Sequence, residues 1–301
     1  MSEPSPRQTA CGFCAIIGAP NAGKSTLVNH LTGAKVAIVS HKVQTTRARL
    51  RAIVMEDDTQ IVLVDTPGIF TPRRKLDTAM VANAWGGAGA ADAVVLLVDG
   101  RQGVTDEVRK IIEGLKAINA QAFLAINKID LMKREALLET AAAFNAAYAF
   151  EQTFMISALN GSGTRDLKTA IAARMPKGPL LYPEDQVADV QLRFMASEIT
   201  REKIYNRLHE ELPYASTVET EGWEERKDGS VKIDQVIYVE RPSQKAIVLG
   251  KGGQTAKILG SQARQDMEKY FERKVHLFLF VKVREKWAED PERLRMMGLE
   301  L

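Results

Sequence analysis

The segment Gly18-Ala19-Pro20-Asn21-Ala22-Gly23-Lys24-Ser25 constrains the fold of this chain more than any other part. It matches the phosphate-loop pattern Gly-x-x-x-x-Gly-Lys-Ser/Thr, whose glycines let backbone N–H groups wrap around phosphates at the start of a helix. An apolar strand pattern precedes it, and a helical pattern begins at Ser25. Lys24 can reach the β and γ phosphates, and the Ser25 hydroxyl can bind Mg²⁺. The sequence therefore predicts a nucleoside triphosphate site rather than an ordinary strand–helix turn.

The first 175 residues alternate short apolar runs with helical patterns. Several runs are apolar throughout, as expected of strands that are buried on both faces of a sheet. This alternation predicts a doubly wound, mostly parallel α/β sheet that binds ligands at the carboxyl ends of its strands. The expected strands are Gly12–Gly18, Thr59–Val64, Ala93–Asp99, Ala122–Asn127 and Thr153–Ser157, and the expected helices are Val28–Leu31, Val104–Ile118 and Glu135–Phe150.

Prolines and glycines interrupt this pattern at Met175–Pro179 and Tyr182-Pro183, as is typical of a linker. The remaining pattern predicts a second, α+β domain. We expect a disordered stretch over residues 1–10, a first domain over 11–175, a linker over 176–192, and a second domain with a C-terminal tail over 193–301. Its expected elements are a helix over Arg193–Leu212, a hairpin of Ser216–Arg226 and Ser230–Glu240 around Lys227-Asp228-Gly229, a helix over Ser243–Leu249 capped by Ser243, a helix over Gln254–Phe271, and a strand over Val275–Val283.

The tetrapeptide Asn127-Lys128-Ile129-Asp130, at the end of an expected strand, indicates which base is bound. Guanine presents two adjacent donors, N1–H and the exocyclic amine, which the Asp130 carboxylate can accept as a bidentate pair. Adenine has an acceptor at N1, so a buried carboxylate would reject it. We expect Asn127 to brace the surrounding loops and the Lys128 stem to cover the face of the base. A backbone N–H of Ser157-Ala158-Leu159 would then meet guanine O6.

The segment Asp65-Thr66-Pro67-Gly68 closes another expected strand and indicates how the γ-phosphate is sensed. Asp65 can hold Mg²⁺ through a water, and the Gly68 N–H can meet the γ-phosphate. One threonine of Thr45-Thr46-Arg47 should complete the Mg²⁺ shell when GTP is bound. Loss of the γ-phosphate would release both segments, so we expect an order–disorder switch.

The next residue is Ile69, and here the chain resembles the translation-factor-like GTPases that carry a hydrophobic residue at this position. Small signalling GTPases have a glutamine there, which orients the attacking water. We therefore expect slow intrinsic hydrolysis that uses another aid. The resemblance implies that Thr46 is the Mg²⁺ ligand and that Asn21 binds K⁺ beside the phosphates, where positive charge lowers the barrier. The alternative is that Asn21 only caps the loop.

Together these motifs define the candidate residues of a GTPase site. Catalytic roles are expected for Lys24, Thr46 and Gly68, and Mg²⁺ binding is expected for Ser25, Thr46 and Asp65. Contacts with GTP or GDP are expected from Gly18, Ala19, Pro20, Asn21, Ala22, Gly23, Lys24, Ser25, Thr26, Asp65, Thr66, Pro67, Gly68, Ile69, Asn127, Lys128, Asp130, Ser157, Ala158 and Leu159.

The stretch Ile247–Gly253 resembles the Gly-x-x-Gly loop of KH domains, which clamps about four nucleotides of single-stranded RNA. Its glycines would let a phosphate backbone approach the next helix, and the order of elements is that of the type II KH fold. The apolar side chains of Ile247, Val248, Ile258 and Leu259 would line a groove for bases. The expected RNA-binding residues are Lys245, Ile247, Val248, Gly250, Lys251, Gly252, Gly253, Lys257, Ile258 and Arg264.

Charge is divided within this second region, although the whole chain carries only +3. Residues 181–240 contain 7 basic and 14 acidic residues, a net charge of −7. Residues 241–286 contain 11 basic and 4 acidic residues, a net charge of +7. A clustered basic segment is typical of nucleic-acid binding, and a solvated charged face is the alternative.

Composition excludes several other classes of protein. Hydrophobic residues make up 45% of the chain, which is ample for a core. The two cysteines, Cys11 and Cys14, predict no disulfide framework, and without further ligands nearby we interpret them as structural. The longest apolar run, Ala93–Val98, is far shorter than the roughly 20 residues of a membrane span, and Met1–Ala10 lacks an apolar signal stretch. We therefore expect a cytoplasmic protein, and a monomer.

The combination of both halves resembles the Era family of bacterial ribosome-assembly GTPases over nearly the whole chain. The resemblance implies binding to the 3′ end of 16S rRNA and to the assembling 30S subunit, and peripheral association with the inner membrane surface. The glycine-rich run Trp85–Ala90 departs from the better helix expected there. The segments that carry the resemblance include Gln44–Arg47, Asp65–Ile69, Arg201–Lys203 through Glu211–Tyr214, and Val275–Leu277 through Val281–Val283.

The sequence thus favours an RNA-binding GTPase switch in which hydrolysis times release from the ribosomal subunit. One rival is a GTP-regulated membrane or protein scaffold whose KH fold no longer reads RNA. A second is an RNA-modification enzyme with a GTPase module, although the sequence offers no further catalytic cluster. Trp223 and Trp287 could stack on RNA, but core or interface roles fit them better.

Overall fold

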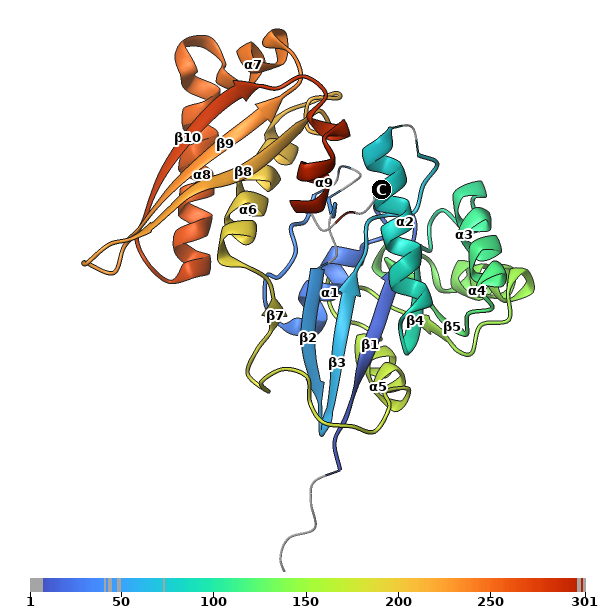
Figure 1. Ribbon diagram of the computed structural model, residues 1–301. Helices are drawn as coiled ribbons and strands as arrows, with labels where there is room; N and C mark the ends of the chain where they lie inside the picture. Colours follow the sequence, from blue (N-terminus) through green and yellow to red (C-terminus); the bar gives the residue numbers. More distant parts are fainter. Residues whose placement is uncertain are drawn as a thin grey trace, which may run out of the picture.

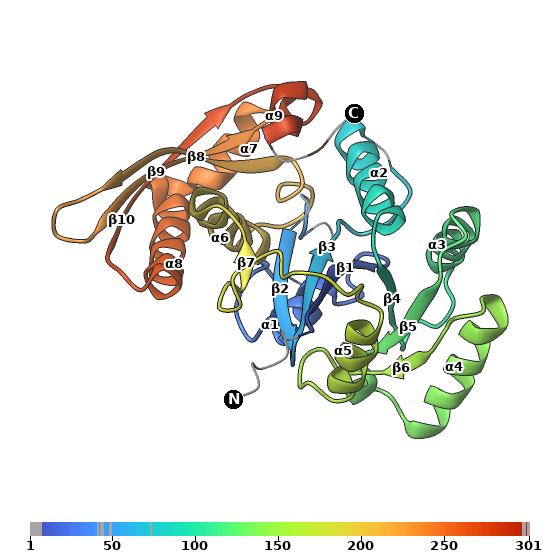
Figure 2. The same ribbon diagram turned by 60° about the horizontal axis from the view of Figure 1, so that its bottom comes forward.

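In this computed structural model, the described residues are 8–40, 42, 45–47, 50–72, 74–296 and 299. Figures 1 and 2 show two groups of elements, joined by a connection that follows one edge of the first sheet. The N-terminal stretch that was expected to be disordered, residues 1–10, lies largely outside the described residues. Within the described part of the chain, no helix combines the length and the apolar character that crossing a membrane requires.

The first domain is built on a mixed, mostly parallel sheet, as the alternating pattern predicts. Its strand order is β6-β5-β4-β1-β3-β2-β7, and β2 runs antiparallel to β3. The strand over Ala93–Asp99 is buried at every position because helices cover both faces of the sheet. The strands are β1 (Ala10–Ile17), β2 (Leu50–Glu56), β3 (Thr59–Asp65), β4 (Ala93–Asp99), β5 (Ala122–Asn127), β6 (Thr153–Met155) and β7 (Ala188–Asp189).

Two hydrophobic clusters hold helices against the two faces of this sheet. On one face, α1 and α5 contribute residues such as Leu27 and Ile171. On the other face, α2, α3 and α4 contribute residues such as Ala88, Ile111 and Phe144. The helices are α1 (Lys24–Thr32), α2 (Lys75–Gly89), α3 (Asp106–Ala117), α4 (Arg134–Ala147) and α5 (Thr164–Ala173), with a 3-10 turn η1 (Ile129–Leu131).

The sequence pattern does not predict β2, α2 or α5. The helix α2 contains the glycine-rich run Trp85–Ala90, whose composition gives it low intrinsic helix propensity. Packing offsets this weakness: the Trp85 ring lies against Gly114 of α3, where an added Cβ would be 2.2 Å from the ring. Tertiary contacts therefore override local propensity in this helix.

The expected linker, residues 176–192, is held against the first sheet rather than left as a free tether. Its short strand β7 pairs antiparallel with β2. The fully buried side chain of Gln60 accepts hydrogen bonds from the backbone N–H groups of Leu181 (2.9 Å) and Tyr182 (3.0 Å), and donates to the Tyr182 carbonyl (2.8 Å). These contacts restrict how the connection can move relative to the sheet.

The second domain has a sheet of order β10-β9-β8 with helices packed on one face (Figure 1). β8 and β9 are antiparallel, whereas β10 is parallel to β9. The core between the sheet and these helices includes Ile204, Ile237 and Leu259. The order of elements is the one that the sequence predicts. They are α6 (Leu192–Arg207), β8 (Ser216–Glu225), β9 (Val231–Val239), α7 (Pro242–Leu249), a 3-10 turn η2 (Lys251–Gly253), α8 (Gln254–Phe271), β10 (Val275–Val283), η3 (Trp287–Glu289) and α9 (Pro291–Met296).

Two helix boundaries in this domain differ from the prediction. The helix α6 ends at Arg207, and the chain turns through residues 208–215 before β8 begins. The helix α7 begins at Pro242 with Arg241 as its N-cap, so the prediction that Ser243 caps it is wrong. Proline favours this start because it has no N–H to satisfy at the first helical position.

The C-terminal elements connect the two domains. Trp287 and Leu294 pack in one hydrophobic cluster with Leu76 and Met80 of α2, and Figures 1 and 2 both place α9 beside α2. Trp287 is 1% exposed, and its indole N–H donates to the Ala215 carbonyl at 3.0 Å. Burial excludes RNA stacking by Trp287 and places it in the interface between the domains.

Candidate functional site

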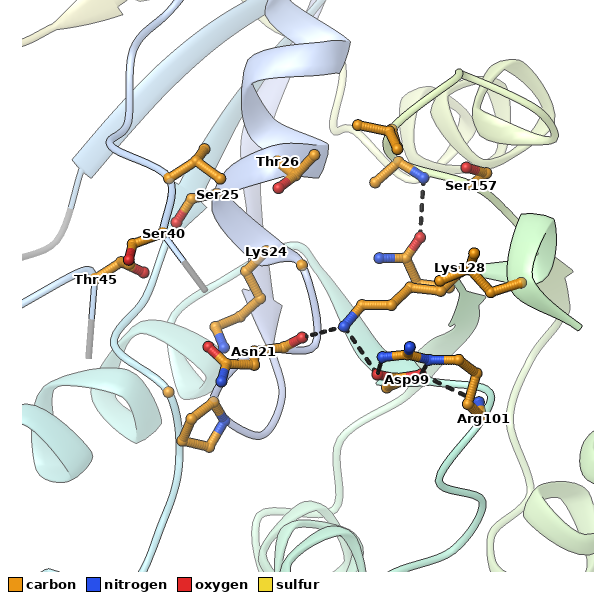
Figure 3. A pocket seen from close by; sticks show the side chains of 18 of the residues that line it. Asn21, Lys24, Ser25, Thr26, Ser40, Thr45, Asp99, Arg101, Lys128 and Ser157 are labelled. Carbon is orange, nitrogen blue, oxygen red and sulfur yellow. Dashed lines mark hydrogen bonds and ion pairs between the residues drawn. The ribbon is translucent and has the colours of Figure 1, made fainter. Parts of the chain in front are cut away.

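A cleft with a volume of about 760 Å³ opens at the carboxyl ends of the parallel strands, beside the start of α1 (Figure 3). Most of the residues predicted to contact GTP line this cleft. They are Pro20, Asn21, Gly23, Lys24, Ser25, Thr26, Gly68, Asn127, Lys128, Asp130, Ser157, Ala158 and Leu159, and Thr46, predicted to bind Mg²⁺, lines it too.

The phosphate loop has the tight conformation that its glycines permit. Gly23 has a φ of 104°, and a Cβ at this position would lie 2.3 Å from Asn127 Nδ2. A Cβ at Gly18 would lie 2.2 Å from the Leu97 carbonyl oxygen. The Lys24 ammonium donates to the carbonyl oxygens of Gly18 and Ala19, at 3.0 Å each. The loop therefore surrounds the lysine side chain that was predicted to contact phosphate.

Lys24 and Asp65 are a buried pair of titratable groups at the base of the cleft, 7% and 0% exposed. Burial lowers the pKa of Lys24 to about 8, and the charge of Asp65 opposes this shift. Burial also raises the pKa of Asp65, while Lys24 and hydrogen bonds from Thr46 and Ser25 oppose that shift. Each charge is thus incompletely compensated, and a ligand that brings both an anion and a cation would stabilise both.

The three residues predicted to hold Mg²⁺ converge at this point. Ser25 Oγ lies 3.0 Å from Thr46 Oγ1, and both hydroxyls donate to Asp65 Oδ2, at 3.0 and 2.9 Å. The other carboxylate oxygen, Asp65 Oδ1, is buried and has no hydrogen-bond partner among the described residues. Hydroxyl, carboxylate and water oxygens are the ligands that Mg²⁺ prefers. The donor set therefore fits Mg²⁺, with Thr46 rather than Thr45 in the cluster and with Asp65 Oδ1 left as an unused acceptor within the described part of the chain.

The base-recognition segment links three loops of the cleft. Asn127 Nδ2 donates to the Ala22 carbonyl at 2.8 Å, and Asn127 Oδ1 accepts from the Ala158 N–H at 2.9 Å. Lys128 has a left-handed backbone, with φ of 67°, and its ammonium donates to the Asn21 carbonyl at 2.7 Å. Asp130 lies in η1, exposed at the mouth of the cleft. Asn127 thus fixes the phosphate loop against the Ser157–Leu159 loop, and Asp130 is left at the edge where a base would enter.

Some residues predicted to contact GTP do not face the cleft. Thr66 is fully buried and its hydroxyl donates to the Ile16 carbonyl at 2.8 Å, so its side chain has a structural role and does not face the cleft. Ile69 packs in the core, and its N–H donates to the Gly18 carbonyl at 3.1 Å. An apolar side chain in this position cannot orient a water. The remaining predicted residues that are absent from the lining are Gly18, Ala19, Ala22, Asp65 and Pro67.

The cleft also contains residues that the motifs do not indicate. Asp99 is the last residue of β4, Arg101 and Gln102 lie in the turn after it, and Asn206 comes from α6 of the second domain. A carboxylate that ends a buried parallel strand is a sequence signal that could have identified Asp99. No local signal identifies Asn206, because it reaches the cleft only through the packing of the two domains. Val39, Ser40, Thr45 and Leu131 complete the lining.

The second domain holds the residues on both sides of Thr46. On one side, the Arg47 side chain is 4% exposed, and its guanidinium lies over the Trp287 ring, 5.4 Å from the centroid. On the other side, Arg201 of α6 donates to the Thr45 carbonyl. The hydrogen bonds of Arg47 go to the Ser216 carbonyl (2.8 Å), Tyr205 OH (3.1 Å), the Pro213 carbonyl (3.2 Å) and the Tyr214 carbonyl (3.3 Å).

The helix α6 also contacts residues 35–39, which precede Thr46 in the chain. Glu202 accepts a hydrogen bond from the Val39 N–H at 3.1 Å and forms an ion pair with Lys35 at 2.7 Å. The neighbouring Lys203 forms an ion pair with Asp266 of α8. A continuous series of polar contacts therefore leads from the segment around Thr46, across α6, to the helix that follows the glycine loop.

The glycine loop lies between α7 and α8 of the second domain. Gly250, Gly252 and Gly253 have φ values of 71°, 59° and 76°, a region that glycine adopts far more readily than other residues. A Cβ at Gly250 would lie 2.2 Å from Thr255 Oγ1. Lys251 at the tip is exposed. The loop thus offers close approach to the start of α8, where backbone N–H groups favour an anion, and adds an exposed positive charge.

The predicted groove beside this loop has fewer available side chains than expected. Ile247 is 56% exposed, but Val248 is fully buried in the domain core, so the prediction that Val248 contacts bases is not supported. Leu259 is buried in the same core. Arg264 forms an ion pair with Glu268 at 2.9 Å, which an RNA phosphate would have to compete with. Lys257 is exposed, and Lys245 and Ile258 are half-buried.

Cys11 and Cys14 are buried free thiols, and burial raises the pKa of Cys14 to about 12. Over the part of the chain that the structure describes, no group of three or more His, Cys, Asp or Glu side chains could hold a metal ion. The burial of both thiols agrees with a structural interpretation of the pair.

Two family matches cover the two halves of the chain. Residues 13–128 match the family described as 50S ribosome-binding GTPase, and residues 211–288 match the KH domain family. The chain is 60% identical over 292 residues to the GTPase Era of Sinorhizobium medicae (strain WSM419), covering 97% of this chain and 94% of that protein. It is 58% identical over 298 residues to the GTPase Era of Brucella suis biovar 1 (strain 1330), covering 99% of this chain and 96% of that protein.

Solved structures of similar proteins extend this likeness to the whole fold. A variant of Era from Aquifex aeolicus bound to GDP and AlF4⁻ is 34% identical, with a TM-score of 0.92 over 97% of this chain and 100% of that chain. An Era in complex with MgGDPNP and nucleotides 1506–1542 of 16S ribosomal RNA has the same identity, coverage and TM-score.

Proposed function

Because this chain belongs to the Era family of GTPases, we propose that it is a GTP-hydrolysing switch that binds the 3′ end of 16S rRNA through its KH domain and assists assembly of the 30S subunit. The family matched by the first domain is described by binding to the 50S subunit. The similar solved complex, however, holds nucleotides of 16S rRNA, which belongs to the small subunit. Because that complex resembles this chain over nearly its full length, it favours the 30S subunit as the partner.

One observation carries this proposal: the second domain makes hydrogen bonds to both neighbours of Thr46. Thr46 belongs to the cluster that fits Mg²⁺, while Arg47 is buried against the KH domain and Thr45 is held by Arg201. Any change in the position of Thr46 between GTP and GDP must therefore disturb contacts with the KH domain. By linkage, RNA must favour GTP binding by the same factor by which GTP favours RNA binding.

The cleft supports distinct roles in GTP binding and hydrolysis. Lys24 would place positive charge on the β and γ phosphates, and the Gly68 N–H would contact the γ-phosphate. Mg²⁺ held by Ser25 and Thr46, and by Asp65 through a water, would supply further compensation for phosphate charge. Asp130 would accept the two guanine donors. The carbonyl of Ala22 and the N–H of Ala158, both bound to Asn127, keep the phosphate and base regions in register.

We further propose that K⁺ assists hydrolysis through Asn21. This residue lines the cleft beside Lys24, and its φ of 62° holds it in a left-handed conformation (Figure 3). Ile69 is in the core and cannot orient water, so another source of positive charge or orientation is needed. Hydrolysis rates should be measured in KCl and in NaCl at equal ionic strength. Equal rates would contradict the K⁺ role and would leave Asn21 as a cap of the loop.

The RNA site would use the backbone of Gly250–Gly253 and the exposed lysines around it. KH loops of this pattern bind single-stranded RNA through its phosphate backbone. Lys251 and Lys257 are exposed at the loop and in the first turn of α8, and Lys245 and Arg264 would add to the positive field. Ile247 and Ile258, rather than Val248, would offer apolar contact to bases.

Binding of a fluorescent single-stranded RNA that copies the 3′ end of 16S rRNA tests this proposal. Affinity should be measured with a GTP analogue, with GDP and without nucleotide, at one fixed salt concentration, because phosphate contacts make affinity depend on salt. We expect the tightest binding with the GTP analogue. Specific binding that ignores the nucleotide would remove the coupling, and absence of specific binding in every state would favour a scaffold whose KH fold does not read RNA.

A matched pair of variants separates loop recognition from general charge. Replacing Lys251 and Gly252 by aspartate should abolish RNA binding while leaving GTP hydrolysis without RNA intact. Lys269→Asp, on the exposed end of α8, reverses a charge in the same domain away from the loop. Equal losses in both proteins would show that overall charge, and not the glycine loop, accounts for binding.

The family resemblance also leads us to propose a monomer in the cytoplasm with loose peripheral attachment to the inner membrane. Sedimentation of the full chain with and without vesicles of anionic bacterial lipids tests both points. A dimer in solution, or no sedimentation with vesicles at low salt, would contradict the corresponding part.

A further inference from the structure

The last residue of β4, Asp99, lies in the nucleotide cleft but belongs to none of the motifs that identify it. It is 7% exposed, and four donors surround its carboxylate (Figure 3). Arg101 supplies its backbone N–H (3.1 Å), its Nε (3.0 Å) and its Nη2 (2.7 Å). Lys128 supplies its ammonium at 2.8 Å. A buried carboxylate with this number of charged donors is a built element of the cleft rather than a solvated surface charge.

The contact with Lys128 has a consequence for base binding. The Lys128 ammonium also donates to the Asn21 carbonyl at 2.7 Å, so it is fixed between the phosphate loop and Asp99. Its backbone is left-handed, with φ of 67°, which fixes the direction in which the side chain leaves. A lysine stem has four rotatable bonds and would otherwise sample many conformations. The hydrogen bonds from its ammonium to the Asn21 carbonyl and to Asp99 hold the stem in one conformation across the cleft.

Charge on Asp99 strengthens these contacts. Burial by itself would raise the pKa of Asp99, but hydrogen bonds from Arg101 and Lys128, together with the positive charge of Lys128, overcome this and lower the pKa to about 2. The carboxylate is therefore ionised throughout the neutral range, and its hydrogen bonds are charge-assisted. Arg101 donates to both carboxylate oxygens and shares Oδ2 with Lys128, so it holds the carboxylate in the orientation that Lys128 contacts.

We propose that Asp99 is a positioning residue for the nucleotide: it holds the Lys128 stem across one face of the base, and Arg101 holds Asp99 in place. This inference rests on the proposed guanine site. It also predicts a division of labour within the cleft. Asp130 faces the edge of the base and selects guanine, whereas Asp99 acts through Lys128 on the face of the base and contributes equally to any purine that fits.

The test is a double-mutant cycle, read out as the dissociation rate of fluorescent GDP from the full chain. Asp99→Asn keeps the shape and one acceptor but removes the charge, and we expect GDP to dissociate roughly tenfold faster. Lys128→Met removes the partner and should give a similar increase. In the double variant we expect no further increase, because Asp99 acts through Lys128. Effects that multiply would overturn the proposal.

A variant of Arg101 distinguishes positioning from a merely structural role. If Asp99 only fastened the loop after β4 through Arg101, Arg101→Gln would raise the GDP dissociation rate as much as Asp99→Asn. We expect a smaller effect, about twofold, because the contact between Asp99 and Lys128 survives. Thermal unfolding of each variant would show whether the fold is retained, and Asp106→Asn, an exposed carboxylate at the start of α3, serves as the control.

The nucleotide dissociation rate measured with a different base provides a second readout, because Asp99 is expected to act on the face of any purine. Asp130→Asn should convert the cleft to xanthosine diphosphate, since an amide can donate to the carbonyl that replaces the guanine amine. In that background, Asp99→Asn should speed dissociation of xanthosine diphosphate by the same factor as for GDP. A factor that differs between bases would overturn the assignment to the base face. Failure of the unaltered chain to bind GDP would overturn the proposed function itself, whereas tight GDP binding that Asp99→Asn leaves unchanged would overturn this inference alone.

Discussion

The nucleotide cleft and the glycine loop of the KH domain both suit phosphate, but they are built in opposite ways. In the cleft, the positive charge is Lys24, which is buried, bonded to two carbonyls and close to the buried Asp65. In the loop, the positive charge is Lys251, which is exposed at the tip of a backbone shaped by glycines. The cleft thus fixes a ligand by side chains held in place in advance, and the loop by backbone shape and a mobile charge.

This difference determines how strongly each region should respond to change. Electrostatic interactions are stronger in a buried, poorly polarisable environment than in water. Exposed charges are screened by salt within about 10 Å. We therefore expect loss of a buried charge in the cleft to have a larger effect than a single change around the loop, and the four predictions below run from the largest expected effect to the smallest.

The largest effect should come from Lys24→Ala. Removing a buried charge that is directed at the transferred phosphate should lower the rate of GTP hydrolysis by roughly a hundredfold or more. Steady-state phosphate release by the full chain measures this. Lys116→Ala, an exposed lysine in the last turn of α3, is the control and should have no measurable effect. A loss below tenfold for Lys24→Ala would mean that the cleft is less pre-organised than its geometry indicates.

A smaller effect should come from Gly250→Ala in the glycine loop. Gly250 has a φ of 71° and a ψ of 176°, a region essentially restricted to glycine, so an alanine there costs about 1–3 kcal/mol, and the new Cβ would also meet Thr255 Oγ1 at 2.2 Å. We expect RNA affinity to fall about tenfold. Gly253→Ala is a comparison variant in the same loop: its φ of 76° and ψ of 10° lie in the left-handed helical region, which residues other than glycine do enter, and nothing lies within 4 Å of its Cβ. If both variants bind RNA equally well, neither the backbone conformation of Gly250 nor its contact with Thr255 shapes the loop.

Coupling between the two regions should be lost in Arg47→Ala. The side chain connects the segment of Thr46 to four groups of the second domain, so its removal should separate the two sites. The ratio of RNA affinities with GTP analogue and GDP, expected to be about fivefold or more, should fall towards one. Arg51→Ala, at a half-exposed position in β2, should preserve this ratio. A ratio unchanged in Arg47→Ala would show that coupling runs through another route, such as Glu202.

The smallest effect should be a pH dependence of GDP affinity. The pKa of Lys24 is lowered to about 8 in the free protein, and a bound phosphate should raise it again. Binding then takes up a proton above the lowered pKa, so affinity should fall as pH rises. From about pH 7 to about pH 8.5 we expect roughly a fourfold loss, measured by titration of fluorescent GDP. An affinity that rises over this range would contradict the burial of a charged Lys24.

Much of the fold and of the cleft could be predicted from the sequence, and the reasons are local. The phosphate loop and the Asn127–Asp130 segment are contiguous, so spacing and residue type reveal them without knowledge of the rest of the chain. Apolar periodicity predicts β4, α3 and the hairpin of β8 and β9 for the same reason. The helix α2 escaped prediction because its glycines are poor helix formers, and its packing against α3 and the C-terminal segment compensates for them.

The sequence by itself determined the motifs of this protein: a phosphate loop, a carboxylate that we propose recognises guanine, and a glycine loop that we propose binds RNA. The tertiary structure alone decided how these parts act on one another. It placed Asp99 beside Lys128, brought Asn206 of α6 into the nucleotide cleft, and turned Val248 into the core. It also buried Arg47 among carbonyl groups of the other domain. These contacts join residues that are distant in the chain, and their stability depends on replacing water by partners that only the packed domains bring together, so no local pattern records them.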